Sequence, residues 1–185
     1  MMVEAARRSL EVQRQEFTAR PLIATPIAGA IAWSVVGLAG ILLPSRQVSF
    51  VLFFATGSIV YLGMFISRFT GENFLDRSRP RNTFDALFLY TVAMALLAFA
   101  IAIPFYLVDH TSLPLSVGIL SGMMWVPLSW ILQHWIGVAH AVVRAALILA
   151  LWYLLPDQRF VAIPFAIVAV YIFTIAILVK RRARQ

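Results

Sequence analysis

Six long apolar stretches, separated by short polar breaks, constrain the fold of this 185-residue chain more than any other feature. A helix needs about 20 mostly apolar residues to cross a bilayer. Stretches of that kind lie at residues 22–43, 48–68, 84–108, 113–133, 136–155 and 160–180. Only 12% of the residues are charged, against about 25% in ordinary soluble domains. The sequence therefore predicts an all-α, polytopic bundle of six transmembrane helices over residues 22–180, with no separate soluble domain.

Most breaks between these stretches have the composition that ends helices. Residues 44–47, 109–112 and 156–159 combine proline or small polar residues with charged ones, and such residues interrupt helical periodicity. The break at 133–137 is the weakest, because it is short and carries Trp135 and Gly137. A five-span chain with one long bent helix through 133–137 therefore remains an alternative.

The distribution of Lys and Arg predicts the orientation. Six spans place both termini, the loop 69–83 and the turn 134–137 on one side, and the positive-inside rule assigns the more basic side to the cytoplasm. That side holds Arg7, Arg8, Arg14, Arg20, Arg68, Arg77, Arg79, Arg81, Lys180, Arg181, Arg182 and Arg184, and the other holds Arg46 and Arg159. We expect a multi-pass protein of a bacterial inner membrane with both termini cytoplasmic. The charges cap apolar segments, so nucleic acid is not an expected partner.

The two ends of the chain are predicted to lie at the cytoplasmic surface. Within residues 1–21, Val3, Ala6, Leu10 and Phe17 recur at helical spacing, which favours an amphipathic helix on the inner leaflet or folded under the bundle. A frayed charged tail is the alternative. The basic tail 181–185 is expected to anchor the chain and to attract anionic lipids.

Small residues recur at helix-contact spacing in two of the predicted spans. Gly29, Gly37 and Gly40 lie in the first, and Gly118 and Gly122 form a small-xxx-small pair in the fourth. Such residues let helix backbones approach closely. They predict close packing within the bundle or, alternatively, a homo-oligomer interface.

Arg144 is the leading candidate for a functional residue. It lies near the centre of the fifth predicted span, roughly 12 Å from its inner end at 1.5 Å per residue. A central arginine costs about 2.5–3.5 kcal/mol on insertion scales, and intramembrane charges are therefore functional candidates. His140 lies one turn earlier on the same face. The pair predicts a site for a carboxylate or phosphate, because a guanidinium binds such groups in a bidentate manner.

Other residues are predicted to line the same inward-opening vestibule. Asp85 is the nearest acid on that side, and a structural Arg144–Asp85 ion pair is the alternative to an anion site. The remaining candidates are polar or aromatic residues near the inner ends of the spans: Arg68, Tyr61, Gln133, His134, Trp125 and Trp130. The two tryptophans flank Pro127, whose missing N–H tends to kink a helix and to form a cavity wall.

Several kinds of chemistry are not supported by the sequence. It has no cysteine, which excludes thiolate catalysis and thiolate metal sites. It lacks the HExxH and phosphate-loop motifs, and His110, His134 and His140 do not share one face or leaflet. We therefore predict no metal and no cofactor.

Three segments resemble a known family. They are residues 13–17 (QRQEF), Gly29 with Trp33, and the segment 122–130 with its Pro127 and Trp130. In these segments the chain resembles an uncharacterised family of small bacterial polytopic membrane proteins, a domain of unknown function. Members carry a histidine after the glycine of the third segment, where this chain has Met123 and Met124. The resemblance implies a six-span inner-membrane protein and no particular activity.

Three functions follow in order of preference. The first is a small-molecule or lipid binding or transport module with an inward-facing anion site. The second is a structural or accessory protein that acts through homo- or hetero-oligomeric helix contacts. The third is an intramembrane lipid-modifying enzyme that uses His140 or His134 as a base.

Overall fold

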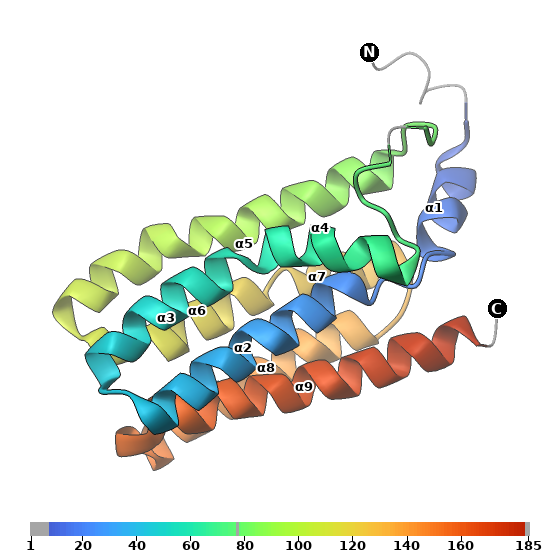
Figure 1. Ribbon diagram of the computed structural model, residues 1–185. Coiled ribbons are helices and arrows are strands. Elements are labelled where there is room, and N and C mark those ends of the chain that lie inside the picture. Colours follow the sequence, from blue (N-terminus) through green and yellow to red (C-terminus); the bar gives the residue numbers. More distant parts are fainter. Residues whose placement is uncertain (1–7, 77, 184–185) are drawn as a thin grey trace.

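A computed structural model of the protein describes residues 8–76 and 78–183, and over these residues the chain forms helices and turns with no strand (Figure 1). The helices are α1 (Leu10–Thr18), α2 (Ala24–Leu42), α3 (Ser45–Gly57), α4 (Ile59–Thr70), α5 (Thr83–Val108), α6 (Leu113–Gly122), α7 (Trp125–Leu132), α8 (Ile136–Leu154) and α9 (Arg159–Arg182). Two short 3₁₀ turns, η2 (His110–Ser112) and η3 (Pro156–Gln158), precede α6 and α9.

The predicted all-α, membrane-compatible architecture is present. Within the described residues, five helical segments are long and apolar enough to cross a membrane, and the bent pair α3–α4 makes a sixth if it is one span. Both ends of the described chain, the loop after α4 and the turn between α7 and α8 lie at one end of the bundle (Figure 1). The turns after α2, α5 and α8 lie at the other end, as the six-span arrangement predicts.

The span predicted over 48–68 is divided into two helices, α3 and α4. The axis bends by 46° between α3 and α4, at Ser58. Here the Ser58 hydroxyl donates to the Ala55 carbonyl at 2.9 Å, and the Thr56 hydroxyl donates to the Leu52 carbonyl at 2.6 Å. Helices kink at Gly/Ser pairs and where hydroxyls compete for main-chain acceptors. The bend turns α4 away from the line of α3 and changes which of its residues face the bundle.

The predicted span at 113–133 is also interrupted. Helix α6 ends at Gly122 and α7 begins at Trp125, so the kink expected from Pro127 lies at Met123 and Met124. Proline cannot donate to the carbonyl four residues before it, and that carbonyl, of Met123, accepts from Val126 at 3.1 Å instead.

The weak break at 133–137 is a true helix end. Gln133 has φ +48°, in the left-handed region, and ends α7. The Ser129 hydroxyl donates to the carbonyl of His134, and the His134 N–H donates to the Ser129 carbonyl at 3.1 Å. The chain reverses here and α7 packs on α8, so one long bent helix through 133–137 is not formed.

The N-terminal segment forms the predicted helix from Leu10 onward. The buried Phe17 ring contacts Phe84 and Phe88 of α5, at centroid distances of 6.4 and 6.1 Å. Helix α1 is therefore folded under the bundle rather than frayed. Leu10, predicted on the same apolar face, is exposed. Val3, Ala6, Arg7, Arg77 and Arg184 lie outside the described residues.

The glycines of α2 and α6 pack against other helices of the same chain. A Cβ on Gly29 would overlap the Tyr171 ring, one on Gly37 would press on Phe165, and one on Gly40 would overlap the Phe160 carbonyl. All three neighbours belong to α9, the helix that packs most extensively on α2. Of the two readings of the glycine spacing, the structure places these residues in contacts within the bundle.

We expect Gly40→Ala to destabilise the protein by about 1–3 kcal/mol, because a methyl group there meets main-chain atoms that cannot move aside. Gly57→Ala is the control, since nothing lies within 4 Å of the position of a Cβ there. Thermal unfolding in one detergent compares the two variants with the wild type. Equal melting temperatures for the two variants would contradict the close α2–α9 approach.

Candidate functional site

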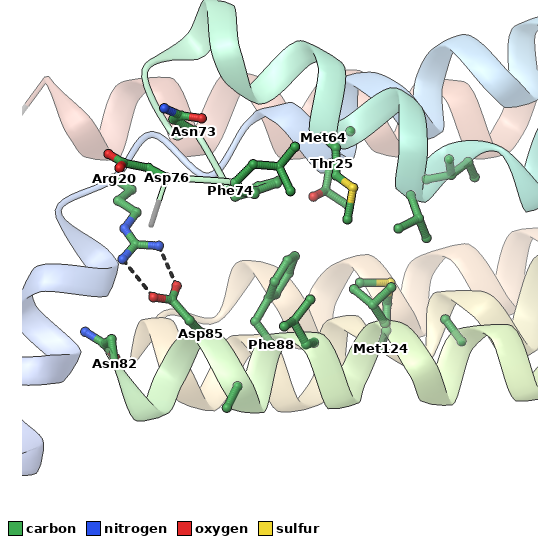
Figure 2. Close-up of a pocket in the computed structure, with 18 of the residues that line it drawn as sticks. Arg20, Thr25, Met64, Asn73, Phe74, Asp76, Asn82, Asp85, Phe88 and Met124 are labelled. Atoms are coloured by element: carbon green, nitrogen blue, oxygen red, sulfur yellow. Dashed lines mark hydrogen bonds and ion pairs between the residues drawn. The ribbon is translucent and has the colours of Figure 1, made fainter. Parts of the chain in front are cut away.

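A cavity of about 760 Å³ opens between α4 and the following loop on one side and α5 on the other (Figure 2). Its walls are mainly apolar. They include Val60, Met64, Phe74, Phe88, Val92 and Leu96. Because its walls are mainly apolar, the cavity suits an apolar chain or ring better than a strongly polar solute.

Charged and amide side chains surround one end of the cavity, which we call the mouth (Arg20, Asn73, Asp76, Arg79, Arg81, Asn82 and Asp85). The guanidinium of Arg20 holds both carboxylate oxygens of Asp85, at 2.5 and 3.0 Å, and Figure 2 shows this pair spanning the mouth. Arg79 lies 3.2 Å from Asp76. The predicted Arg144–Asp85 pair is therefore wrong: Asp85 is near the start of α5 and is already bound by an arginine that precedes α2.

The deeper part of the cavity, which we call the floor, contains Ser121, Met124 and Tyr171. Arg144 lies directly behind it and is 1% exposed. Its guanidinium donates to the Tyr171 hydroxyl at 3.1 Å and to the Ser121 hydroxyl at 3.0 Å. Arg144 is therefore not itself a lining residue but supports the two hydroxyl groups that are.

The charge of Arg144 has no carboxylate partner among residues 8–76 and 78–183, where the ion pairs involve other arginines. Its Cζ lies 5.5 Å from the Trp33 ring centroid and 5.4 Å from that of Tyr171, so aromatic faces give partial compensation. Gly122 provides the space, because a Cβ there would lie 3.1 Å from Arg144 Cδ and Nε. Burying a guanidinium without a carboxylate partner is costly in an apolar environment, which makes Arg144 a candidate functional residue.

Tyr171 is the group best placed to pass this charge to a ligand. Its hydroxyl oxygen accepts a hydrogen bond from Arg144. Among the described residues, the hydroxyl donates to no acceptor. The Ser121 hydroxyl, in contrast, donates a hydrogen bond to the Val117 carbonyl at 2.6 Å. The Tyr171 O–H is therefore free to donate into the cavity, and the adjacent guanidinium strengthens it as a donor.

His140 is buried beside this site but does not line the cavity. The Thr174 hydroxyl donates to the Val170 carbonyl, so His140 Nδ1 donates to Thr174 Oγ1, at 2.8 Å. The ring stacks on Trp125 with centroids 4.3 Å apart. His140 and Arg144 do share the predicted inward face, and Trp125 packs beside them, but His140 acts in packing rather than in lining.

Five predicted site residues lie elsewhere. Tyr61 is 74% exposed and Trp130 is 62% exposed, with Arg14 Cζ 4.8 Å above the Trp130 ring. Arg68 and Gln133 are also exposed. His134 is half-buried and uses Nδ1 to accept from the Ile136 N–H at 3.2 Å. Depth along the bundle is the property that these five residues share. The bend at Ser58 turns Tyr61 and Arg68 away from the cavity, and the reversal at Gln133 turns Gln133 and His134 away.

The sequence did not predict four polar residues in or near the site. Ser121 and Tyr171 line the cavity, whereas Thr174 binds His140 and Glu72 binds the start of α2. Tyr171 and Thr174 are polar residues one helical turn apart in an otherwise apolar helix, which is a detectable signal. Glu72 lies in the polar loop between α4 and α5 and is fully buried. No local pattern could have found it, since its partners lie about 50 residues earlier in the chain.

Residues 5–181, nearly the whole chain, match DUF7010, a family of unknown function. The chain belongs to this family. The resemblance to a family of unknown function is thereby confirmed. Because the function of DUF7010 is unknown, membership does not assign an activity to this chain. No match was found among curated proteins or among solved structures. Any function must therefore be argued from the site.

We expect Ser121→Ala to cost about 1–3 kcal/mol, because it leaves a buried, charged Nη2 without an acceptor. Arg144→Met should cost less, since it removes the buried charge while retaining an apolar chain. Ser116→Ala is the matched control, because its hydroxyl binds carbonyls of its own helix turn. Thermal unfolding in detergent ranks the three. If Arg144→Met is the least stable, Arg144 serves mainly to hold the helices together.

Proposed function

We propose that this protein binds an amphipathic molecule with one anionic group, held with its apolar part between α4 and α5 and its anionic group at the Tyr171 hydroxyl. The observation that carries the proposal is the combination of an apolar cavity with a floor whose hydroxyls are bound to a buried guanidinium that has no described carboxylate partner. A lipid-derived carboxylate or phosphate fits both features.

The size and surroundings of the cavity support a small molecule. Small-molecule sites typically measure about 300–1,000 Å³ and are mostly apolar with a few placed polar groups. At about 760 Å³ the cavity falls within this range. Its position between helices compatible with a membrane favours a molecule that partitions into lipid.

The electrostatics support an anionic group at the floor rather than at the mouth. At the mouth, Arg20 and Arg79 are each paired with an aspartate. At the floor, the charge of Arg144 is balanced by hydroxyl and aromatic groups alone among the described residues. Electrostatic attraction is strongest where water is excluded, so an incoming anion gains most beside Tyr171.

The other two functions have weaker support. The glycines that suggested an oligomer interface lie against α8 and α9 of the same chain. An enzyme based on His140 lacks access to the cavity, because that ring is packed between Trp125 and Tyr171. Binding, with transport as its extension, is therefore the function that we propose.

We further propose that the mouth end of the bundle faces the cytoplasm, because most Lys and Arg residues lie there. The chain has no cysteine, so a single introduced cysteine can be labelled selectively to show on which side of the membrane it lies. An impermeant maleimide added to intact cells should label Gln158→Cys and should label Ala183→Cys only after lysis. The reverse pattern would invert the orientation.

Tyr171→Phe removes the hydroxyl that would donate to the ligand and that also accepts from Arg144, and we expect the affinity for dodecanoate to fall about tenfold or more, as for a lost hydrogen bond to a charged group. Tyr61→Phe is the matched control, because that ring lies on the outside of α4. Binding of dodecanoate and of neutral dodecanol to the purified protein in a maltoside detergent is measured for each. Equal binding of both molecules by the wild type, or an unchanged Tyr171→Phe, would contradict the anion site.

A second pair of variants tests the walls of the cavity. Ala95 lines it and Leu97, on the same helix, is 69% exposed. Ala95→Phe should fill the cavity and abolish dodecanoate binding, while Leu97→Phe should leave it unchanged. Binding that survives Ala95→Phe would place the ligand elsewhere.

A further inference from the structure

Three basic side chains meet where α1 packs against the turn between α7 and α8 and the end of α9, and we call them the basic corner (Arg14, His134 and Arg181). Arg14 Cζ lies 4.8 Å from the centroid of the Trp130 ring, near the end of α7. One turn further along α1, the Thr18 carbonyl accepts from Arg181 Nη2 at 2.8 Å. The corner lies at the end of the bundle that holds both ends of the described chain (Figure 1). None of its three residues lines the large cavity.

Arg14 of α1 contacts aromatic rings and has little of its hydrogen-bonding capacity used. Its Cζ lies 5.3 Å from the centroid of the Phe84 ring, in addition to the Trp130 contact. Its Nη1 is 3.7 Å from Glu11, whose side chain is 62% exposed, and an exposed ion pair contributes little free energy. Its Nε is buried and has no hydrogen-bond partner in the described chain. The guanidinium is therefore positioned by the rings and retains donors for another group.

Arg181, near the end of α9, is half-buried and has no carboxylate partner among the described residues, whose ion pairs involve other arginines. The Thr18 carbonyl accepts one of its N–H groups, and a guanidinium has five. Its Nε is buried and also lacks a partner in the described chain. Arg181 is thus a second guanidinium with donors that the described residues do not use.

His134 adds a neutral donor to the same corner. Its Nδ1 accepts from the Ile136 N–H at 3.2 Å, so the proton of the neutral ring is on Nε2. Burial and the charge of Arg181 both lower the pKa of His134, so the ring stays neutral at pH 7. The imidazole therefore offers one N–H to an acceptor without adding a third positive charge.

The surroundings of the basic corner resemble the headgroup level of a bilayer. Trp130 and Trp135 are 62% and 56% exposed, and exposed tryptophans at the ends of membrane-compatible helices are typical of the membrane–water interface. The acids that could compensate the corner from α1 and α5 are occupied, since Glu16 pairs with Arg8 and Asp85 with Arg20. An anion from the lipid surface would supply the charge that the corner lacks.

We propose that the basic corner binds the phosphate group of an anionic phospholipid. Guanidinium groups bind phosphate in a bidentate manner, and Arg14 and Arg181 bring two of them from different helices, with His134 Nε2–H as a further donor. A phospholipid is favoured over free phosphate because the neighbouring Trp130 and Trp135 are exposed as interfacial side chains are. The lipid would link α1 and α9 to the bilayer, and this site does not depend on the proposed function.

Native mass spectrometry of the delipidated full chain tests the proposal. The chain is titrated in mild detergent with dioleoyl phosphatidylglycerol or with zwitterionic dioleoyl phosphatidylcholine. We expect a single phosphatidylglycerol to bind in preference to phosphatidylcholine, and its affinity to fall about tenfold in Arg181→Gln, as for a lost hydrogen bond to a charged group. Arg182→Gln is the matched control, because it removes the same charge from the adjacent, exposed position and should bind like the wild type.

Arg14→Lys separates a built site from the general attraction of basic residues, and it covers the case in which Arg181→Gln does not fold. It keeps the charge but loses the planar fork and the ring contacts, so the affinity for phosphatidylglycerol should fall severalfold. Wild-type affinity in Arg14→Lys, or an equal loss in Arg181→Gln and Arg182→Gln, overturns the proposal.

Two further results would also overturn it: no preference for phosphatidylglycerol over phosphatidylcholine, and displacement of the lipid by excess inorganic phosphate, which would make the free anion the ligand. Arg144→Met should bind phosphatidylglycerol like the wild type, because Arg144 lies behind the floor of the cavity and not in the basic corner. A failure of dodecanoate binding therefore contradicts the proposed function alone.

Discussion

The guanidinium of Arg144, held by hydroxyls from two other helices, is the interaction on which the centre of this bundle depends. It joins α8 to Ser121 of α6 and to Tyr171 of α9, and close glycine contacts leave space for both large side chains. This arrangement is energetically costly because, among the described residues, no carboxylate neighbours the buried guanidinium. A membrane protein that keeps such a charge carries a cost that an apolar residue would avoid, and a bound anion would offset it.

The cavity joins this charge to the other unusual region, the loop 71–82. One end is formed by hydroxyls backed by Arg144, and the other by the loop, the Arg20–Asp85 pair and the start of α2. The loop is attached to α2 through Glu72, whose carboxylate caps that helix. Thr25 and Phe74 line both the large cavity and a small cavity beside Glu72, so the large cavity and the Glu72 contact share side chains.

The sequence predicts the architecture well and the site less well, for physical reasons. Helix length, apolarity and the grouping of basic residues are local properties, so the spans, the kink near Pro127 and the reversal at 133–137 could be anticipated. Arg144 could be found because a charge in an apolar helix stands out. Its partners could not, since pairing depends on how helices rotate against one another. Because of the bend at Ser58, Tyr61 and Arg68 lie outside the predicted site. Asp85 pairs with Arg20 instead of Arg144.

We propose that the buried charge of Arg144 serves to hold an anionic amphipathic molecule. The decisive experiment is native mass spectrometry of the wild-type protein, extracted from its membrane in mild detergent and compared with Arg144→Met. We expect a co-purifying anionic molecule on the wild type that is absent from the variant, and its mass would identify its chemistry. Bare protein of the expected mass in both samples would contradict the claim and make Arg144 a structural residue.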